Sequence, residues 1–106
     1  MSSRIGFHPD ARRDLREAAD FYDLERLGLG AEYLDEVEQT MRRVIEYPES
    51  SPVVLGRVRK CAIPRSPYTI VYSARGGGGG GGGGGVVYVS AVAHNSRRPF
   101  YWRDRL

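Results

Sequence analysis

Residue types that could carry out chemistry are sparse in this 106-residue chain. There are two histidines, His8 and His94, and a single cysteine, Cys61. An imidazole exchanges a proton near neutral pH, so His94, which follows an apolar segment, is a candidate acid or base. A histidine at the end of a strand also commonly serves only as a structural hydrogen-bonding residue, and both interpretations stay open. Two separated histidines and one cysteine do not form a metal-ligand set, so we expect no metal and no cofactor.

Arginine supplies most of the remaining chemistry, because its planar guanidinium binds a phosphate or a carboxylate through two parallel hydrogen bonds. The whole chain has a formal net charge of +3. Residues 1–50 hold seven Arg and twelve Asp or Glu (net −5), whereas residues 51–106 hold eight Arg, one Lys and one Asp (net +8). The basic second half is typical of a surface that meets nucleic acid or an acidic protein segment, although a solvated surface would look the same.

Two amphipathic helices are expected in the first half of the chain. Residues 8–10, His-Pro-Asp, begin the first helix, which reaches Arg26 or Leu27. Two glycines within residues 28–30 then allow a reversal into a second helix from about Ala31, so that the pair forms an antiparallel hairpin. The apolar positions recur every three or four residues and are Ala11, Leu15, Ala18, Ala19 and Tyr22 in the first helix and Leu34, Val37, Met41, Val44 and Ile45 in the second.

Short strands account for most of the rest. An edge strand is predicted at residues 5–7, and β-branched, aromatic or alternating residues predict further strands at 53–55, 57–63, 68–72 and 86–93. Residues 97–106 form a short helix or an irregular arm. The predicted fold class is therefore α+β, a single domain over residues 1–106 with the helical hairpin packed on a mostly antiparallel sheet.

Ten consecutive glycines, residues 76–85, separate the last two strong strands. A hairpin loop normally needs two to five residues, so the tract is interpreted as a loop replacement within the domain. A flexible glycine chain closes easily over the roughly 5 Å between paired strands, and the fold should tolerate it. An engineered linker, a codon-slippage expansion or a placeholder for unidentified residues would each explain the tract better than a phosphate-binding loop.

Nothing in the sequence indicates export. A lone cysteine gives no reason to expect an oxidising compartment, and residues 1–9 lack an apolar stretch of signal-peptide length. The longest apolar-rich run, residues 86–93, is too short to span a bilayer. We therefore expect a cytoplasmic protein with no membrane partner.

Three segments carry a family resemblance when taken in order. They are HPDARRDL (residues 8–15), PRSPYTIVY (64–72) and VAHNSRRPFYWR (92–103). Together they resemble the RelE/ParE superfamily, the toxins of type II toxin-antitoxin (plasmid stabilization) systems. The resemblance implies a helical hairpin on a curved antiparallel sheet and a toxin that arrests growth. It also implies a cognate antitoxin, whose disordered C-terminal segment folds on the toxin and holds it inactive in a hetero-oligomer.

Two activities are implied by the resemblance. RelE-like members cut mRNA on the ribosome, which needs a base, an acid and cations for the developing charge. ParE-like members poison DNA gyrase by protein contact and need a binding surface instead. The ending RRPFYW (97–102), the single lysine Lys60 and the modest net charge favour the ParE-like branch, so we expect a toxin that is not an enzyme. A third interpretation is an inactive member that only binds antitoxin.

Candidate site residues follow for each activity. If the chain were RelE-like, His94 would be the acid or base, Tyr101 a supporting donor, and the phosphate clamps would be Arg59, Arg65 and Arg97. The residues expected to bind the antitoxin or the target are Arg57, Arg59, Arg65, Arg97, Arg98, Tyr101 and Trp102. Two alternatives remain: Arg97 and Arg98 could simply be solvated, and Trp102 could anchor the tail to the body.

Overall fold

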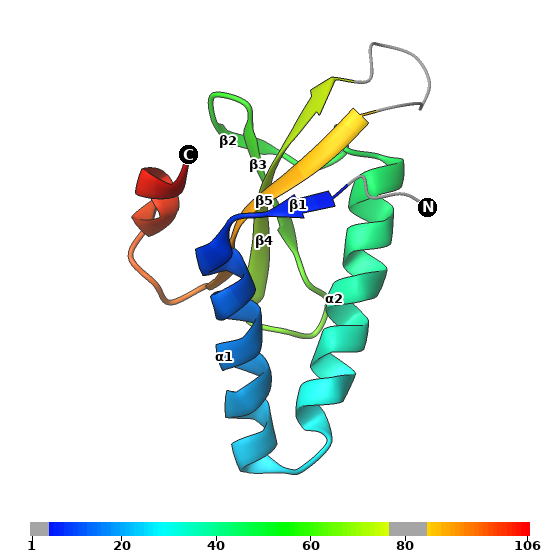
Figure 1. The fold of residues 1–106 in the computed structure, drawn as a ribbon, viewed down its shortest axis with the longest axis vertical. Helices are drawn as coiled ribbons and strands as arrows, with labels where there is room; N and C mark the ends of the chain where they lie inside the picture. Colours follow the sequence, from blue (N-terminus) through cyan, green and yellow to red (C-terminus); the bar gives the residue numbers. More distant parts are fainter. Residues whose placement is uncertain (1–4, 77–84) are drawn as a thin grey trace.

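The computed structural model describes residues 5–76 and 85–106. Figure 1 shows two helices that form a hairpin beside a twisted sheet, with a short helix at the C-terminus on the far side. In chain order the elements are β1 (Ile5–Phe7), α1 (Pro9–Glu25), α2 (Leu29–Glu46), β2 (Val53–Leu55), β3 (Val58–Ala62), β4 (Tyr68–Gly76), β5 (Gly85–His94) and the 3-10 helix η1 (Tyr101–Arg105). The α+β prediction is confirmed, including the edge strand and the hairpin.

Helix α1 begins where the sequence predicted. His8 is the residue before the helix, and its Nδ1 accepts a hydrogen bond from the Asp10 backbone N–H at 3.0 Å. Pro9 occupies the first turn, where its missing N–H costs nothing. The helix buries Ala11, Ala18 and Ala19 and ends at Glu25, one or two residues earlier than expected.

The turn between the helices is held by a side chain that sequence reasoning did not use. Asp23 accepts hydrogen bonds through Oδ1 from the backbone N–H groups of Gly28 (3.1 Å) and Gly30 (2.8 Å). Gly28 has a φ of 99°, which favours glycine. At Gly30 an added Cβ would lie 2.5 Å from the Ala19 carbonyl oxygen, so a glycine is needed for the close approach of the two helices.

Helix α2 differs from the expectation in its apolar face. It begins at Leu29, two residues earlier than predicted, and its buried residues include Tyr33, which is 5% exposed. Leu34, predicted to face the core, is 42% exposed, so that assignment was wrong. Tyr33 lies one turn before Val37 and therefore continues the inward stripe, whereas Leu34 is rotated about 100° away from Tyr33.

The sheet is mixed and has the strand order β1-β5-β4-β3-β2. Only the β1 pairing with β5 is parallel, and the other three pairings are antiparallel. A β-bulge interrupts β5: Val71 pairs with Ala91 and Tyr72 with Val89, so Ser90 has no partner across the ladder. The glycine tract enters the sheet at both ends, because Gly76 pairs with Gly85, while the loop predicted between them, at residues 77–84, lies outside the described residues.

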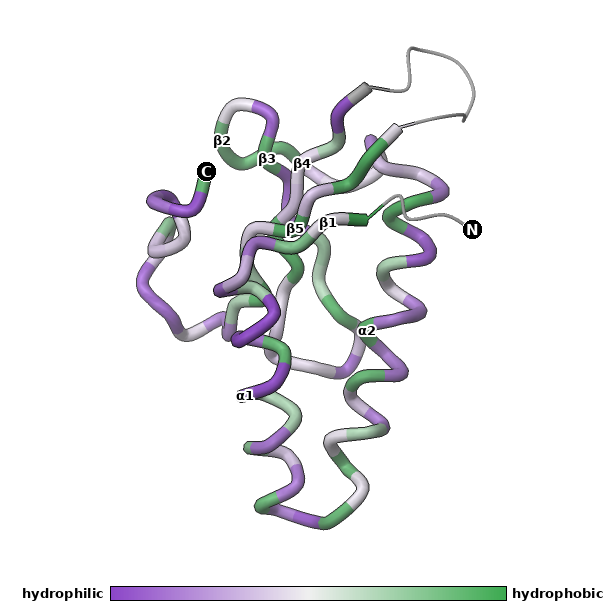
Figure 2. The backbone as a smooth tube through the Cα atoms, viewed as in Figure 1, coloured by the Kyte–Doolittle hydropathy of each residue, from purple (hydrophilic) through white to green (hydrophobic). Residues whose placement is uncertain are grey.

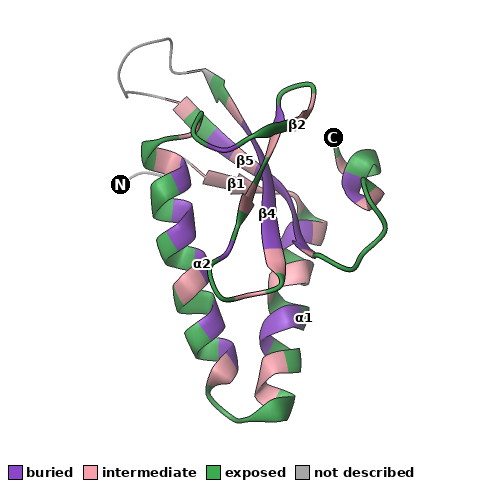
Figure 3. Cartoon of the chain, turned by 180° about the vertical axis from the view of Figure 1, so that it is seen from behind, coloured by how far each residue is buried: buried purple, intermediate pink, exposed green. Residues whose placement is uncertain are grey.

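Both faces of the sheet are covered. The helices bury one face, and their inward sides are the buried ones while their outer sides are exposed (Figure 3). The same division appears as alternating hydrophobic and hydrophilic residues along the helices in Figure 2. The opposite face is partly covered by η1, whose Trp102 is 3% exposed and packs in a second apolar cluster that includes Val71 and Ala91. No helix in the described ranges has the length and apolarity needed to cross a bilayer.

Candidate functional site

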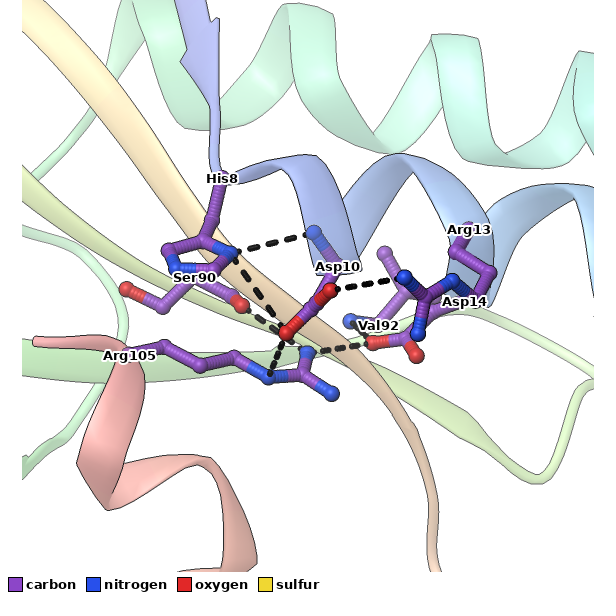
Figure 4. A network of polar contacts seen from close by, with 7 residues as sticks. All are labelled: His8, Asp10, Arg13, Asp14, Ser90, Val92 and Arg105. Atoms are coloured by element: carbon purple, nitrogen blue, oxygen red, sulfur yellow. Dashed lines mark hydrogen bonds and ion pairs between the residues drawn. The ribbon is translucent and has the colours of Figure 1, made fainter.

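The site is built around the place where the C-terminal tail returns to the body. Arg105, in the last turn of η1, donates through Nη1 to Asp14 Oδ2 at 2.7 Å and to the Ser90 carbonyl at 3.1 Å. The Ser90 carbonyl lies at the bulge in β5. Asp14 Oδ2 also accepts the Val92 backbone N–H at 3.1 Å, and Figure 4 shows α1, β5 and the tail meeting there.

The contact between Arg105 and Asp14 is largely shielded from solvent, since the two side chains are 15% and 12% exposed. Burial acts to lower the pKa of Arg105, but the hydrogen bond and the charge of Asp14 outweigh it, and the pKa is raised. Asp10 lies at the edge of the same network, with Oδ2 at 3.9 Å from Arg105 Nε and Oδ1 at 3.2 Å from Arg13 Nη2. The ion pair therefore ties the tail to α1, and the raised pKa keeps the Arg105 guanidinium charged.

A hollow of about 230 Å³ lies beside this ion pair. Its walls combine α1, β4, β5 and the tail, and the residues that matter here are Asp14, Tyr68, His94, Arg97 and Tyr101. Three of the sequence-predicted site residues, His94, Arg97 and Tyr101, are thus brought together. We call this space the tail hollow.

His94 is oriented within the tail hollow by its neighbours. Its Nδ1 lies 3.0 Å from the Ser96 backbone N–H, which donates to it, and 2.8 Å from Ser96 Oγ. The ring meets Tyr68 edge to face, with centroids 5.0 Å apart. Since a neutral imidazole carries its proton on one nitrogen, a hydrogen bond accepted at Nδ1 leaves the proton on Nε2.

Tyr101 is covered by arginine on its ring. The Arg97 guanidinium carbon lies 3.8 Å from the ring centroid and that of Arg105 lies 5.2 Å away. Burial, followed by the nearby charge of Asp14, raises the pKa of Tyr101 above its ordinary value. The phenol therefore stays protonated at neutral pH and can act only as a hydrogen-bond donor or acceptor there.

The other two proposed phosphate clamps lie outside the tail hollow. Arg59 Nη1 donates to the carbonyls of Glu49 (3.1 Å) and Ser51 (2.6 Å), which fixes the segment before β2. Arg65 is 82% exposed and forms an ion pair with Glu36 of α2 at 2.8 Å. The five candidates for cleavage therefore lie in three separate places.

The remaining contact candidates have different surroundings. Arg57 is exposed in the turn between β2 and β3 and lines a hollow of about 210 Å³ on the sheet face opposite the helices, together with Arg75. Arg98 is exposed in the segment before η1. Trp102 is buried and anchors the tail to the body, which was one of its two predicted roles.

Two residues of this region, Asp14 and Arg105, were missed by sequence reasoning. A signal for Asp14 existed, because it lies three residues after Ala11 and four before Ala18 and so falls on the inward stripe of α1. No comparable signal existed for Arg105, which is one of several arginines in the tail. Among the described residues no group of three or more His, Cys, Asp or Glu side chains could hold a metal ion.

The fold corresponds to a small domain of the RelE/ParE type. The family model described as the ParE toxin of type II toxin-antitoxin system, parDE, matches residues 5–99, most of the chain. The chain belongs to this ParE toxin family. The match ends before η1, and no curated protein matches the sequence.

Proposed function

We propose that this ParE-family toxin acts in the cytoplasm by protein contact, inhibiting DNA gyrase, and that a cognate antitoxin neutralises it in a hetero-oligomer. The family membership supports the toxin and its antitoxin partner. The separation of the cleavage candidates carries the choice of mechanism. Phosphoryl transfer needs cations that converge on one phosphate, and Arg59 and Arg65 are each engaged elsewhere.

The antitoxin contact is proposed on the basic second half of the chain. Arg57 and Arg75 line the hollow of about 210 Å³ on the sheet face opposite the helices, in the part that η1 does not cover. Lys60 is exposed on the neighbouring strand β3. Arg97 and Arg98 lie in the segment that precedes η1. An acidic antitoxin segment would complement these cations, and the strand edges offer it backbone hydrogen bonds.

The RelE-like alternative rests on one observation. His94, Arg97 and Tyr101 share the tail hollow, so an acid or base, a cation and a phenol are close together. In this alternative His94 would face the substrate through Nε2, since Nδ1 accepts from Ser96, and it could donate a proton from Nε2 only as the imidazolium, after giving up that hydrogen bond. The toxin would then cleave mRNA on the ribosome without needing Arg59 or Arg65.

Purified toxin assayed in parallel on two targets tests the proposal. We expect loss of gyrase supercoiling, intact labelled mRNA on translating ribosomes, and restoration of supercoiling when the antitoxin is added. His94→Ala should keep the inhibition of gyrase, with His8→Ala as the matched histidine control. Cleavage of mRNA that depends on ribosomes and is lost in His94→Ala would instead establish the RelE-like alternative. Antitoxin binding without either effect would indicate an inactive member.

A further inference from the structure

We infer that a hollow at the helical hairpin binds the side chain of an arginine presented by a partner protein. This hollow lies between α1, α2 and the segment joining β3 to β4, and its volume is about 270 Å³. We call it the hairpin hollow. The residues that the inference uses are Tyr22, Tyr33, Glu32, Glu36, Arg65 and Ser66. None of them lines the tail hollow, and only Arg65 was among the residues that the sequence predicted for a binding or cleavage site.

The hydroxyl group of Tyr33 is buried without a hydrogen-bond partner among the described residues, and this is the first observation. Tyr33 as a whole is 5% exposed. A polar group buried in this way costs free energy unless something pairs with it. The rings of Tyr22 and Tyr68 lie 5.0 Å and 5.4 Å away and fix the position of the Tyr33 ring. Tyr33 is one of the residues that line the hairpin hollow, and a ligand there would reach its hydroxyl by shifting the side-chain atoms that cover it.

The other polar atoms at the hairpin hollow are mainly oxygens that can accept. Tyr22 Oη and Ser66 Oγ lie 3.4 Å apart, a long hydrogen bond that leaves both hydroxyls with accepting capacity. Glu32 and Glu36 add two carboxylates, of which Glu32 already faces Arg26 Nη2 at 3.7 Å. A guanidinium presents five N–H donors in one plane and no acceptor, so it matches a hollow rich in oxygens. Aromatic rings nearby also suit a guanidinium, which stacks on them.

The charge of the hairpin hollow also selects a cation. The hairpin hollow is lined mostly by residues of the first half of the chain, and residues 1–50 hold seven Arg against twelve Asp or Glu. Among the described residues that line this hollow, Arg65 is the one cation; it is 82% exposed and forms an ion pair with Glu36 at 2.8 Å. Glu36 is 28% exposed and so is the less solvated partner. An incoming arginine would replace Arg65 at Glu36 and could extend inward to the tyrosine hydroxyls.

The test uses the whole toxin and a minimal probe, Nα-acetyl-arginine amide, titrated by backbone amide NMR. We expect saturable shifts at Tyr22, Tyr33 and Ser66 with a Kd on the order of 1 mM. The citrulline amide, which has the same shape without the charge, should bind at least tenfold more weakly, and the lysine amide at least threefold more weakly. Equal binding of either analogue would overturn the inference.

Four variants locate the site. Glu36→Gln should weaken the arginine probe at least fivefold, whereas Glu38→Gln, the same charge change on an exposed position of α2, should leave it unchanged. Tyr33→Phe should weaken the probe at least threefold in a protein that still folds. Arg65→Ala should strengthen it about threefold, because a competitor for Glu36 is removed. Unchanged binding in Tyr33→Phe, or weaker binding in Arg65→Ala, would contradict the inference. None of these outcomes depends on gyrase or on toxicity.

Discussion

Two of the ion pairs that connect distant parts of the described chain lie in contrasting surroundings. Asp14 and Arg105 are 12% and 15% exposed, and each has additional hydrogen bonds to β5. Glu36 and Arg65 meet at the same kind of distance, 2.8 Å against 2.7 Å, but Arg65 is 82% exposed. Ion pairs of similar length therefore serve different purposes. The shielded pair fixes the tail, whereas in the exposed pair an arginine of a partner protein can replace Arg65 at Glu36.

The largest effect is expected from breaking the shielded pair. Asp14→Ala leaves Arg105 without its partner in a largely dry position and removes the acceptor for the Val92 N–H. We expect the free energy of unfolding to fall by about 3 kcal/mol, measured by urea denaturation. Arg105→Ala should give a similar loss, and the double variant should lose much less than the sum, because the two residues act together. If the losses of the two single variants simply added in the double variant, the contact between Asp14 and Arg105 would not be what holds the tail to the body.

How far the sequence anticipated this arrangement depends on the range of the interaction. Local patterns predicted β1, the start of α1 and the strands, and allowed a short C-terminal helix as one of two alternatives, because capping residues and apolar periodicity act within a few positions. They did not reveal the bulge at Ser90 or the return of Arg105 to Asp14, which joins residues 91 positions apart. The separation of Arg59 and Arg65 from His94 was equally hidden, since an arginine side chain follows whichever acceptor the fold brings near.

The one helix-face error has a related cause. Both Tyr33 and Leu34 satisfy the apolar spacing of α2, and hydropathy alone favours leucine. In the structure the larger ring of Tyr33 fills the space beside Tyr22 and Tyr68, so packing among three tyrosines decided which residue faces inward. The same packing buries the Tyr33 hydroxyl without a partner among the described residues.

Alkaline pH should destabilise both the helical hairpin and the tail, because each contains a tyrosine whose pKa is raised. Burial is the main cause of the raised pKa of Tyr33 and also of that of Tyr101. A tyrosine whose pKa is raised by folding stabilises the native state fully below its unfolded pKa of about 10, and this contribution is lost as the pH rises toward the folded pKa. Each such tyrosine should cost about 1.4 kcal/mol per pH unit above pH 10. Urea denaturation from about pH 9 to about pH 11, one unit on either side of the usual tyrosine pKa, should give a shallower loss for Tyr33→Phe than for the wild type.

At neutral pH, Tyr33→Phe should increase the free energy of unfolding by about 1 kcal/mol. The substitution removes a buried hydroxyl that lacks a partner and keeps the ring contacts with Tyr22 and Tyr68. Thermal and urea unfolding measure the change, and Tyr22→Phe, which removes a hydroxyl near Ser66, serves as the matched control with little or no gain. A clear loss of stability in Tyr33→Phe would mean that the hydroxyl is paired in solution.

The smallest effect is expected at the exposed pair. Arg65→Ala should change the free energy of unfolding by less than about 0.5 kcal/mol, because a solvated ion pair gains little over its separate hydration. Raising the salt concentration should leave the urea midpoint of the wild type unchanged, since salt screens the shielded pair only weakly. Comparing Arg65→Ala with Arg105→Ala under identical conditions gives the sharpest contrast, since each deletes the arginine of an ion pair with a helix, Arg65 from the segment between β3 and β4 and Arg105 from the tail. A loss at Arg65 as large as that at Arg105 would make the exposed pair a structural element, and an arginine from a partner could then displace it only by destabilising the turn between β3 and β4.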